Sequence, residues 1–316
     1  MKKFALHIYI LIGVFVIGFI VGSFLDQQLS QAIFVRNDTF GLVLSAIGTT
    51  PGYGCFALIG GSFLTIGLYR KDYKLWMKIV FYALAVACYG LAVYFSGREF
   101  FGSNGFYWVA PEWVGYLIEL PIMGGLCYLG FRMGKNSDNN NLWLLLIILM
   151  VAIFVALVPG VTILKTIFRR PRYRMITSPE VAALDYVGFH SWWERCADYK
   201  EIIAKYAEQG VVIIKEEFKS FPSGHAGASA VLFLYVAFLP LINKKYEKIQ
   251  VPLFYGAVAW CFLVCASRIW VGAHFLSDVS MGGLLTAICL LIAFYVVINN
   301  KMLVKSEEKI EEPQKE

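Results

Sequence analysis

The sequence contains eight apolar runs of about 20 residues, and this feature constrains the fold more than any other. The hydrocarbon core of a bilayer needs about 20 apolar residues per helix, so each run has the length of a membrane span. Hydrophobic residues make up 59% of the 316 residues and charged residues 16%, which excludes soluble globular, disordered, coiled-coil and collagen-like chains. The sequence therefore predicts an all-α, multi-pass transmembrane helix bundle with spans at 4–24, 53–69, 75–96, 113–132, 142–165, 223–243, 251–267 and 278–298.

The Lys and Arg residues of the short loops predict how this bundle lies in the cell membrane. Cytoplasmic loops carry an excess of these residues. When eight spans are threaded, the loops 25–52 and 97–112, which carry only Arg36 and Arg98, fall on one side of the membrane. We therefore expect both termini on the opposite, cytoplasmic side, together with Lys2, Lys3, Arg70, Lys71, Lys74, Arg132, Lys135, Lys244, Lys245, Lys248, Lys301 and Lys305.

The charge pattern argues against nucleic acid as a partner, and the cysteines argue against a zinc site and against disulfides. The net charge of +6 is divided among loops and does not form one continuous basic face, so nucleic acid is not an expected partner. Six of the seven cysteines lie in apolar runs and no CxxC pair occurs. The sequence therefore predicts neither a structural zinc site nor a disulfide framework.

Changes in polarity divide the chain into parts. Residues 1–140 hold the N-terminal membrane helices, 141–300 hold a core that contains the three motif segments described below, and 301–316 form a charged tail that we expect to be disordered and cytoplasmic. The polar segment 174–220 interrupts the core on the outer side of the membrane. The apolar stretch 40–47 is too short to span, so we expect an interfacial or re-entrant piece there.

The polar segment 174–220 is much longer than a simple connection requires. Loops of such length usually have a function or a structure of their own. Charged and apolar residues alternate from Tyr199 to Tyr206, which predicts at least one short helix. We expect the segment to act as a lid that selects substrate without supplying catalytic groups, with Trp192 and Trp193 entering the lipid interface.

Basic and titratable residues concentrate at three places beside the predicted spans, all on the outer side. They are residues 165–173 at the end of the fifth run, 221–225 at the start of the sixth, and 267–278 between the last two. Such residues near spans are costly and mark functional sites. Glu119, inside the fourth run, is another ionisable group and is either a polar contact near the site or a buried, hydrogen-bonded carboxyl group.

These segments contain the groups of an oxyanion site. Ser223 and Gly224 stand where the sixth run should begin, so their backbone N–H groups and the helix dipole would point at an anion. Lys165, Arg172 and Arg268 add cationic donors, and a guanidinium fork matches phosphate oxygens.

The same segments contain the groups of nucleophilic catalysis. His274 and Asp278 are four residues apart, a spacing that on a helix would place the carboxylate beside the imidazole ring. His225 would face the same pocket from another helix. Two histidines, one carboxylate and several cations indicate phosphoryl transfer through a histidine nucleophile. A metal site made from the same three residues is not expected, because the cations would repel a divalent ion.

Together the three segments resemble the signature of the type-2 phosphatidic acid phosphatase superfamily, the integral-membrane lipid phosphate phosphatases. That signature is Lys, six residues, Arg-Pro; then Pro-Ser-Gly-His; then Ser-Arg, five residues, His, three residues, Asp. The last two parts match at every fixed position. In the first part Lys165 and Arg172 keep the spacing, but Tyr173 replaces the family's Pro, and an Arg-Pro pair stands two residues earlier at Arg170. Arg172 is therefore our preferred phosphate ligand, and Arg170 is the alternative.

The resemblance implies a fold and a role for each matched residue. The family has a core of six spans with the first motif after the third span, whereas five runs precede that motif here, so two additional helices are expected upstream. By the resemblance, His274 attacks phosphorus, Asp278 orients it, and His225 protonates the leaving group and then activates water. The phosphate oxygens would be held, without a metal or other cofactor, by Lys165, Arg172, Ser223, Gly224 and Arg268.

The expected activity is hydrolysis of a lipid phosphate or diphosphate at the outer membrane face. Polyprenyl diphosphate is the first substrate to consider, with phosphatidylglycerol phosphate and phosphatidic acid as others. One alternative is a phosphotransferase that passes the phosphate to a lipid or sugar acceptor. Another is a non-catalytic lipid-phosphate-binding protein or transporter, which would not need the second histidine or the His-Asp pair.

Overall fold

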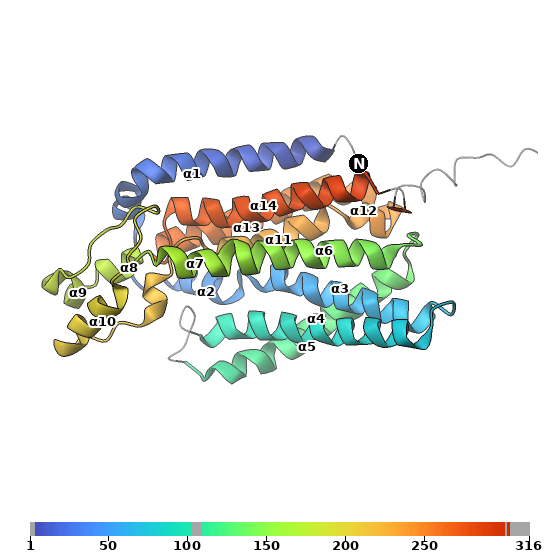
Figure 1. Ribbon diagram of the computed structural model, residues 1–316, viewed down its shortest axis with the longest axis horizontal. Helices are drawn as coiled ribbons and strands as arrows, with labels where there is room; N and C mark the ends of the chain where they lie inside the picture. The colour runs from blue at the N-terminus through green and yellow to red at the C-terminus, as the bar shows by residue number, and fades with distance from the viewer. Residues whose placement is uncertain (1–3, 103–108, 301, 304–316) are drawn as a thin grey trace, which may run out of the picture.

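The computed structural model describes residues 4–102, 109–300 and 302–303. Most of the tail that we predicted to be disordered, with Lys2, Lys3, Lys301 and Lys305, lies outside these residues. The described residues form helices and no β-strand, which confirms the predicted all-α class (Figure 1). The α-helices are α1 (Ala5–Ile33), α2 (Thr39–Ile47), α3 (Thr50–Tyr69), α4 (Leu75–Phe101), α5 (Glu112–Lys135), α6 (Leu142–Leu157), α7 (Leu164–Phe168), α8 (Tyr173–Ile176), α9 (Pro179–Leu184), α10 (Tyr199–Glu208), α11 (Gly224–Val236), α12 (Leu239–Ile242), α13 (Glu247–Trp270) and α14 (Leu276–Ile298).

Seven helical segments of the described chain are long and apolar enough to cross a membrane. The remaining predicted run, 223–243, forms α11 of 13 residues followed by α12. The fifth span is α6 and α7, joined by a π-helical turn over Val158–Ile163. The stretch 40–47, which we predicted to be an interfacial or re-entrant piece, lies in α2, and residues Thr39–Tyr69, which include α2 and α3, have the length and composition of one 31-residue span.

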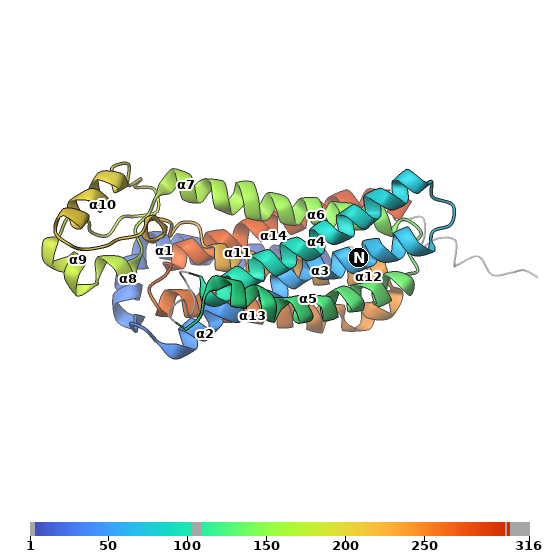
Figure 2. The same cartoon turned by 90° about the horizontal axis from the view of Figure 1, so that it is seen from below.

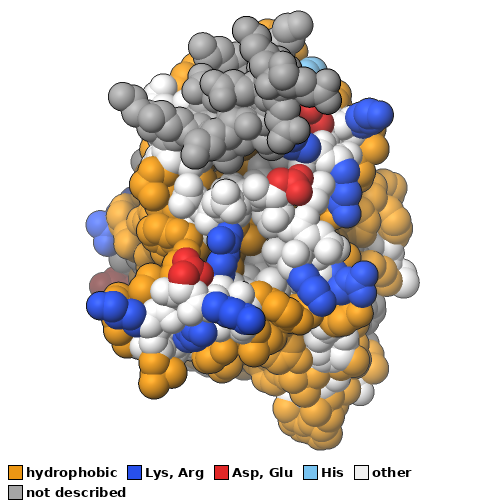
Figure 3. Space-filling view, turned by 90° about the vertical axis from the view of Figure 1, so that its right-hand side faces the viewer, with side chains coloured by type: hydrophobic (Ala, Val, Ile, Leu, Met, Phe, Trp, Pro, Cys, Tyr) orange, Lys and Arg blue, Asp and Glu red, His pale blue; other side chains and the backbone are white. Residues whose placement is uncertain are grey.

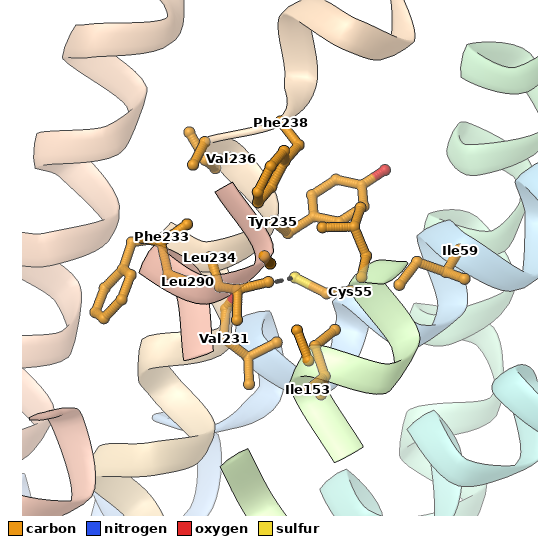
Figure 4. Close-up of a cluster of buried hydrophobic side chains, with 14 of the residues drawn as sticks. Cys55, Ile59, Ile153, Val231, Phe233, Leu234, Tyr235, Val236, Phe238 and Leu290 are labelled. Atoms are coloured by element: carbon orange, nitrogen blue, oxygen red, sulfur yellow. Dashed lines mark hydrogen bonds between the residues drawn. The ribbon is translucent and has the colours of Figure 1, made fainter. Parts of the chain in front are cut away.

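Helix α11 lies at the centre of the bundle and is in contact with α3, α6, α13 and α14. Most of its side chains are buried. Figure 4 shows how Val231, Leu234 and Tyr235 of α11 meet Cys55 of α3 and Ile153 of α6 in the hydrophobic core. Helix α1 lies along α14 on the outside of this group (Figure 1).

Helices α4 and α5 form a pair beside this bundle. They pack against each other and against α3, whereas α11 packs against α3, α6, α13 and α14. Helix α11, its four neighbours α3, α6, α13 and α14, and helix α1, which lies along α14, thus form a group of six helices. The pair α4 and α5 agrees in number and position with the two upstream helices expected beyond a six-span core.

The two ends of the bundle differ in chemistry. Helices α8, α9 and α10 form a cap at the end where α7 stops and α11 begins (Figures 1 and 2). Figure 3 views the opposite end, where Lys and Arg side chains gather on the surface. The connection between α3 and α4, whose sequence includes Arg70 and Lys71, lies at that end, as does the C-terminal end of α5, whose last turn contains Arg132 and Lys135 (Figure 1).

The polar segment 174–220 folds on itself, with α10 as the short helix that we predicted over residues 199–206. It has its own hydrophobic cluster, which includes Cys196, Ile202, Tyr206 and Phe218. The Trp192 ring stacks on Phe221 at 5.4 Å and its Nε1–H donates to Ser23 of α1, whereas its entry into a lipid interface stays a prediction. Trp193 is 51% exposed.

Candidate active site

The three motif-bearing segments meet at one end of the bundle. Lys165 comes from α7, His225 from the first turn of α11, and His274 from the loop between α13 and α14. The two imidazole rings have centroids 6.5 Å apart, and both histidines are buried. A Cβ atom on Gly224 would lie 3.2 Å from Lys165 Nζ, so glycine at this position lets the ammonium group approach the start of α11.

His274 sits in a tight loop that fixes its ring. Gly272 has a φ of +63°, which glycine adopts without steric cost, and its carbonyl accepts the Arg174 N–H. His274 Nδ1 lies 2.7 Å from the Ser220 carbonyl oxygen. Because a carbonyl only accepts hydrogen bonds, Nδ1 carries the hydrogen and Nε2 carries the lone pair. Burial lowers the pKa of His274 to about 3, although Asp278 opposes the effect, so the ring is neutral near pH 7.

Asp278 and His274 are not the helical pair that their spacing suggested. His274 lies in the loop, whereas Asp278 is in the first turn of α14, which begins at Leu276. Asp278 Oδ2 is 3.8 Å from His274 Nδ1 and accepts hydrogen bonds from Ser220 Oγ at 2.5 Å and from the Phe275 N–H at 2.8 Å. Asp278 is therefore connected to the His274 ring mainly through Ser220, whose carbonyl holds that ring.

Arg170 is fully buried and joins two carboxylates. Its guanidinium donates to Asp278 Oδ1 at 2.6 Å and to Asp26 Oδ2, on α1, at 2.9 Å. Its Nε–H donates to the His190 carbonyl in the polar segment 174–220, which we call the capping segment. The donors of Arg170 are thus turned to protein acceptors and to the ring of Phe275, 3.9 Å away. This arrangement suits an arginine that orients Asp278 and disfavours it as the phosphate ligand.

Arg172, by contrast, lines a cavity that also contains Lys165 and His225. Its NH1 lies 3.7 Å from Glu217 Oε1, and Arg174 makes two hydrogen bonds to the same carboxylate. Burial tends to raise the pKa of Glu217, but the two arginines outweigh it and hold the pKa below its usual value. Glu217 is therefore ionised near pH 7 and steadies Arg172 at the cavity.

This cavity has a volume of about 500 Å³ and is polar at one end only. Beside the cations and His225, it is bordered by Arg98 and Glu99 of α4. Its other walls are apolar side chains of α3, α4 and α6, including Phe56, Leu91, Phe95, Met150, Phe154 and Leu157. A cationic head site continuous with apolar walls matches an amphiphilic, anionic ligand.

Two predicted phosphate-binding groups are engaged differently from what we expected. Ser223 is the N-cap of α11, as its position suggested, and its Oγ accepts the Ala226 N–H. Its own N–H donates to the Asp278 carbonyl, so that N–H does not point at an anion, whereas Gly224 N–H is in the first turn. Arg268 is 1% exposed and its NH2 donates to the Gly41 carbonyl, which anchors the guanidinium beside α2.

Glu119 has the character of a buried, hydrogen-bonded carboxyl group. It accepts hydrogen bonds from Ser96 on α4 at 2.7 Å and from Thr50 on α3 at 3.1 Å. The Glu119 side chain lies outside the group of residues that line the cavity described above. Its contacts join α3, α4 and α5.

Sequence reasoning missed several groups that touch the motif residues, among them Asp26, Ser45, Glu99 and Ser220. Asp26 and Glu99 stand at the ends of apolar runs, and an acidic residue there is the only signal that could have pointed to them. Ser45 takes part through its backbone carbonyl, and Ser220 through both its carbonyl and its Oγ; a backbone carbonyl has no side-chain signature.

Comparison with known families places the protein in a class. The signature of the PAP2 superfamily matches residues 141–302, about half of the chain, and the protein belongs to this superfamily. It is also similar to sphingosine-1-phosphate phosphatase 1 of Rattus norvegicus and of Mus musculus, 36% identical over 83 residues in each case. The similarity covers 25% of this chain and 18% of either relative, so the chain matches less than a fifth of their length. No solved structure matches.

Proposed function

We propose that the protein is an integral-membrane phosphatase that hydrolyses a lipid phosphate or diphosphate through a phosphohistidine intermediate. One observation carries the proposal: the rings of two buried histidines have centroids 6.5 Å apart, and one of them, His225, lines a cavity that has cations at one part and apolar walls elsewhere. Membership of the PAP2 superfamily and the similarity to sphingosine-1-phosphate phosphatases support the same reaction class.

In the first step, Nε2 of His274 forms a bond to phosphorus and the bond from phosphorus to the lipid oxygen breaks. The electron pair of that bond goes to the leaving oxygen, which takes a proton from His225. In the second step, His225 takes a proton from water, the water oxygen bonds to phosphorus, and the P–N bond breaks to restore His274. Asp278 and Ser220 keep the Nδ1–H tautomer that leaves Nε2 free to attack.

The phosphate oxygens are held by Lys165, Arg172 and the Gly224 N–H, with Ser223 Oγ and Arg268 at the edge of the site. Cations aimed at the oxygens are most valuable in the transition state, where negative charge accumulates. The donor set of cations and a helix N-terminus neutralises charge without a metal ion. Among the described residues, no group of three His, Cys, Asp or Glu side chains is placed to hold one.

The lipid chain occupies the apolar part of the cavity, and the head group lies at the outer face of the membrane. The Lys and Arg residues gathered at the opposite end of the bundle support this orientation, with both termini in the cytoplasm (Figure 3). Polyprenyl diphosphate, phosphatidylglycerol phosphate and phosphatidic acid are the substrates that we would test first.

The test is phosphate release by the detergent-purified protein from these lipids, with excess EDTA and with or without vanadate. We expect activity that survives EDTA and is inhibited by vanadate, which mimics the transition state. Loss of activity on chelation, restored by one divalent metal, would contradict the metal-free mechanism. Phosphate transfer to an added alcohol in place of release to water would indicate a phosphotransferase.

A further inference from the structure

Helix α4, which lies outside the group of helices around α11, brings a carboxylate to the candidate active site. Glu99 Oε2 is 3.5 Å from Nε2 of His225, and both residues line the cavity. The same Nε2 lies 3.1 Å from the Ser45 carbonyl oxygen of α2. Because a carbonyl cannot donate, Nε2 carries a hydrogen, and that hydrogen faces two acceptors from outside the three motifs.

The charges around His225 explain why a carboxylate is needed there. A general acid must carry its proton when the leaving group departs, yet burial and neighbouring cations both oppose a positively charged ring. The charged and titratable groups around His225 are Arg98 and Glu99 from α4, Lys165 from α7, Arg172 before α8, Arg268 from α13 and His274 from the loop that follows α13. Glu99 is the carboxylate of this set.

The other two acidic groups near the site, Asp278 and Glu217, form ion pairs with arginines. Asp278 is bound by Arg170 at 2.6 Å, and Glu217 is bound by Arg174 at 2.5 Å. Of the three carboxylates, Glu99 is the one whose oxygen lies within 4 Å of a His225 ring nitrogen in the described part of the chain. An opposite charge within about 4 to 6 Å favours the charged form of a group.

Helix α4 is also held in register at the level of Glu99. Ser96, one turn earlier, donates to Glu119 of α5 at 2.7 Å and lies 2.9 Å from Thr50 Oγ1 of α3. This network ties α4 to two neighbouring helices close to the site. It gives the buried Glu119 a role in keeping the Glu99 carboxylate in place.

We propose that Glu99 is a positioning residue for His225: its carboxylate stabilises the protonated imidazole that gives a proton to the leaving group. The inference rests on the proposed phosphatase function. It implies that the additional helix pair α4 and α5 supports the general acid, His225. The nucleophile, His274, is supported by the motif segments and by α1. Substrates with poor leaving groups, such as alkyl lipid phosphates, depend on this carboxylate most.

The test compares two substrates that differ in their need for a general acid. The alkoxide of an alkyl lipid phosphate must be protonated as it leaves, whereas the p-nitrophenolate of p-nitrophenyl phosphate departs without a proton. The measured quantity is kcat/KM, because it reports the steps up to phosphorylation of His274 and excludes the common second step. The variants are Glu99→Gln, Glu99→Asp, His225→Asn and the Glu99→Gln/His225→Asn pair, with Glu112→Gln on α5 as the matched loss of a carboxylate away from the cavity.

We expect Glu99→Gln to lower kcat/KM for the alkyl lipid phosphate about 10- to 100-fold and for p-nitrophenyl phosphate less than about 3-fold. Glu99→Asp should restore part of the loss, Glu112→Gln should match the unsubstituted protein, and the double variant should be no slower than His225→Asn alone. Equal losses on both substrates, or additive losses in the double variant, would overturn the role of Glu99. If the unsubstituted protein hydrolyses neither substrate, the phosphatase proposal itself fails.

Discussion

Arg170 and Arg172 are two residues apart, and the structure predicts opposite consequences for their removal. Arg170 is 0% exposed and binds Asp26 at 2.9 Å and Asp278 at 2.6 Å. Breaking a buried ion pair by deleting one partner costs about 3 to 5 kcal/mol, because the remaining charge is buried and uncompensated. Arg170→Ala leaves two such carboxylates, so we expect a loss of stability at the upper end of that range.

Arg172→Ala leaves no comparable defect, since Glu217 keeps its two hydrogen bonds from Arg174. Arg172→Ala should instead lower the rate of hydrolysis. Loss of one oxyanion donor costs about 2 to 4 kcal/mol of transition-state stabilisation, or roughly 30- to 900-fold in rate. Vanadate should also inhibit this variant more weakly. The two substitutions therefore separate structural support from phosphate binding.

Thermal unfolding in detergent and vanadate inhibition are the two measurements. Arg170→Ala should lower the midpoint by on the order of 10 °C, and Arg172→Ala by much less. Adding Asp26→Asn to Arg170→Ala should recover part of the stability, because it removes one of the two buried charges that have lost their partner. If Arg170→Ala is as stable as the unsubstituted protein and loses vanadate inhibition, Arg170 is the phosphate ligand and our assignment of that role to Arg172 is wrong.

Two further predictions concern the nucleophile and the lipid chain. His274→Ala should abolish phosphate release while the protein still inserts, because it removes the nitrogen that forms the bond to phosphorus; full activity at matched protein amounts would disprove the phosphohistidine mechanism. The cavity follows α6 and the π-helical turn after it from Met150 to Thr162, about 18 Å at roughly 1.5 Å per residue, so it can hold a long chain. Filling it with Leu91→Trp should raise KM for long-chain lipid phosphates at least about tenfold, about 1.4 kcal/mol, and leave a short-chain phosphate ester unaffected. Equal effects on both chain lengths would place the chain elsewhere.

The membrane spans and the meeting of the motifs could be predicted from the sequence because both depend on simple rules. A run of 20 apolar residues specifies a span by length alone, and three motifs that end or begin spans on one side must share that side. The sequence could not show that Arg170 faces Asp26, because this contact joins residues 144 positions apart. Nor could spacing alone distinguish Arg170 from Arg172: the αL conformation of Arg169, at φ 52°, turns the chain between Lys165 and both arginines.

The pairing of His274 and Asp278 illustrates a subtler limit. A four-residue spacing predicts neighbours on a helix, and the two groups are indeed 3.8 Å apart, but only Asp278 is helical. The connection runs through Ser220, at the end of the capping segment, which sequence spacing assigns to neither motif. Backbone carbonyls and loop geometry decide such contacts, and neither has a pattern of residue types.

The segment 174–220, whose role as a lid stays a prediction, also contacts residues of the candidate site. Its His190 carbonyl accepts from Arg170, and its Glu217 binds Arg172. Trp192 fastens this segment to the bundle by stacking on Phe221, which precedes the second motif, and by donating to Ser23 of α1. A full replacement of the segment would thus disturb catalysis as well as selection of substrate.

The two neighbouring tryptophans allow a finer test of this attachment. Truncation of a buried Trp costs about 3 to 5 kcal/mol, and Trp192, which is partly exposed, should cost less than that. Trp192→Ala should make residues 174–220 more susceptible to limited proteolysis and change the ranking of lipid phosphates. Trp193→Ala removes a ring that is 51% exposed and should do neither, which makes it the matched control. If Trp192→Ala leaves both the proteolysis pattern and the ranking unchanged, the attachment through Trp192 does not hold the segment over the site.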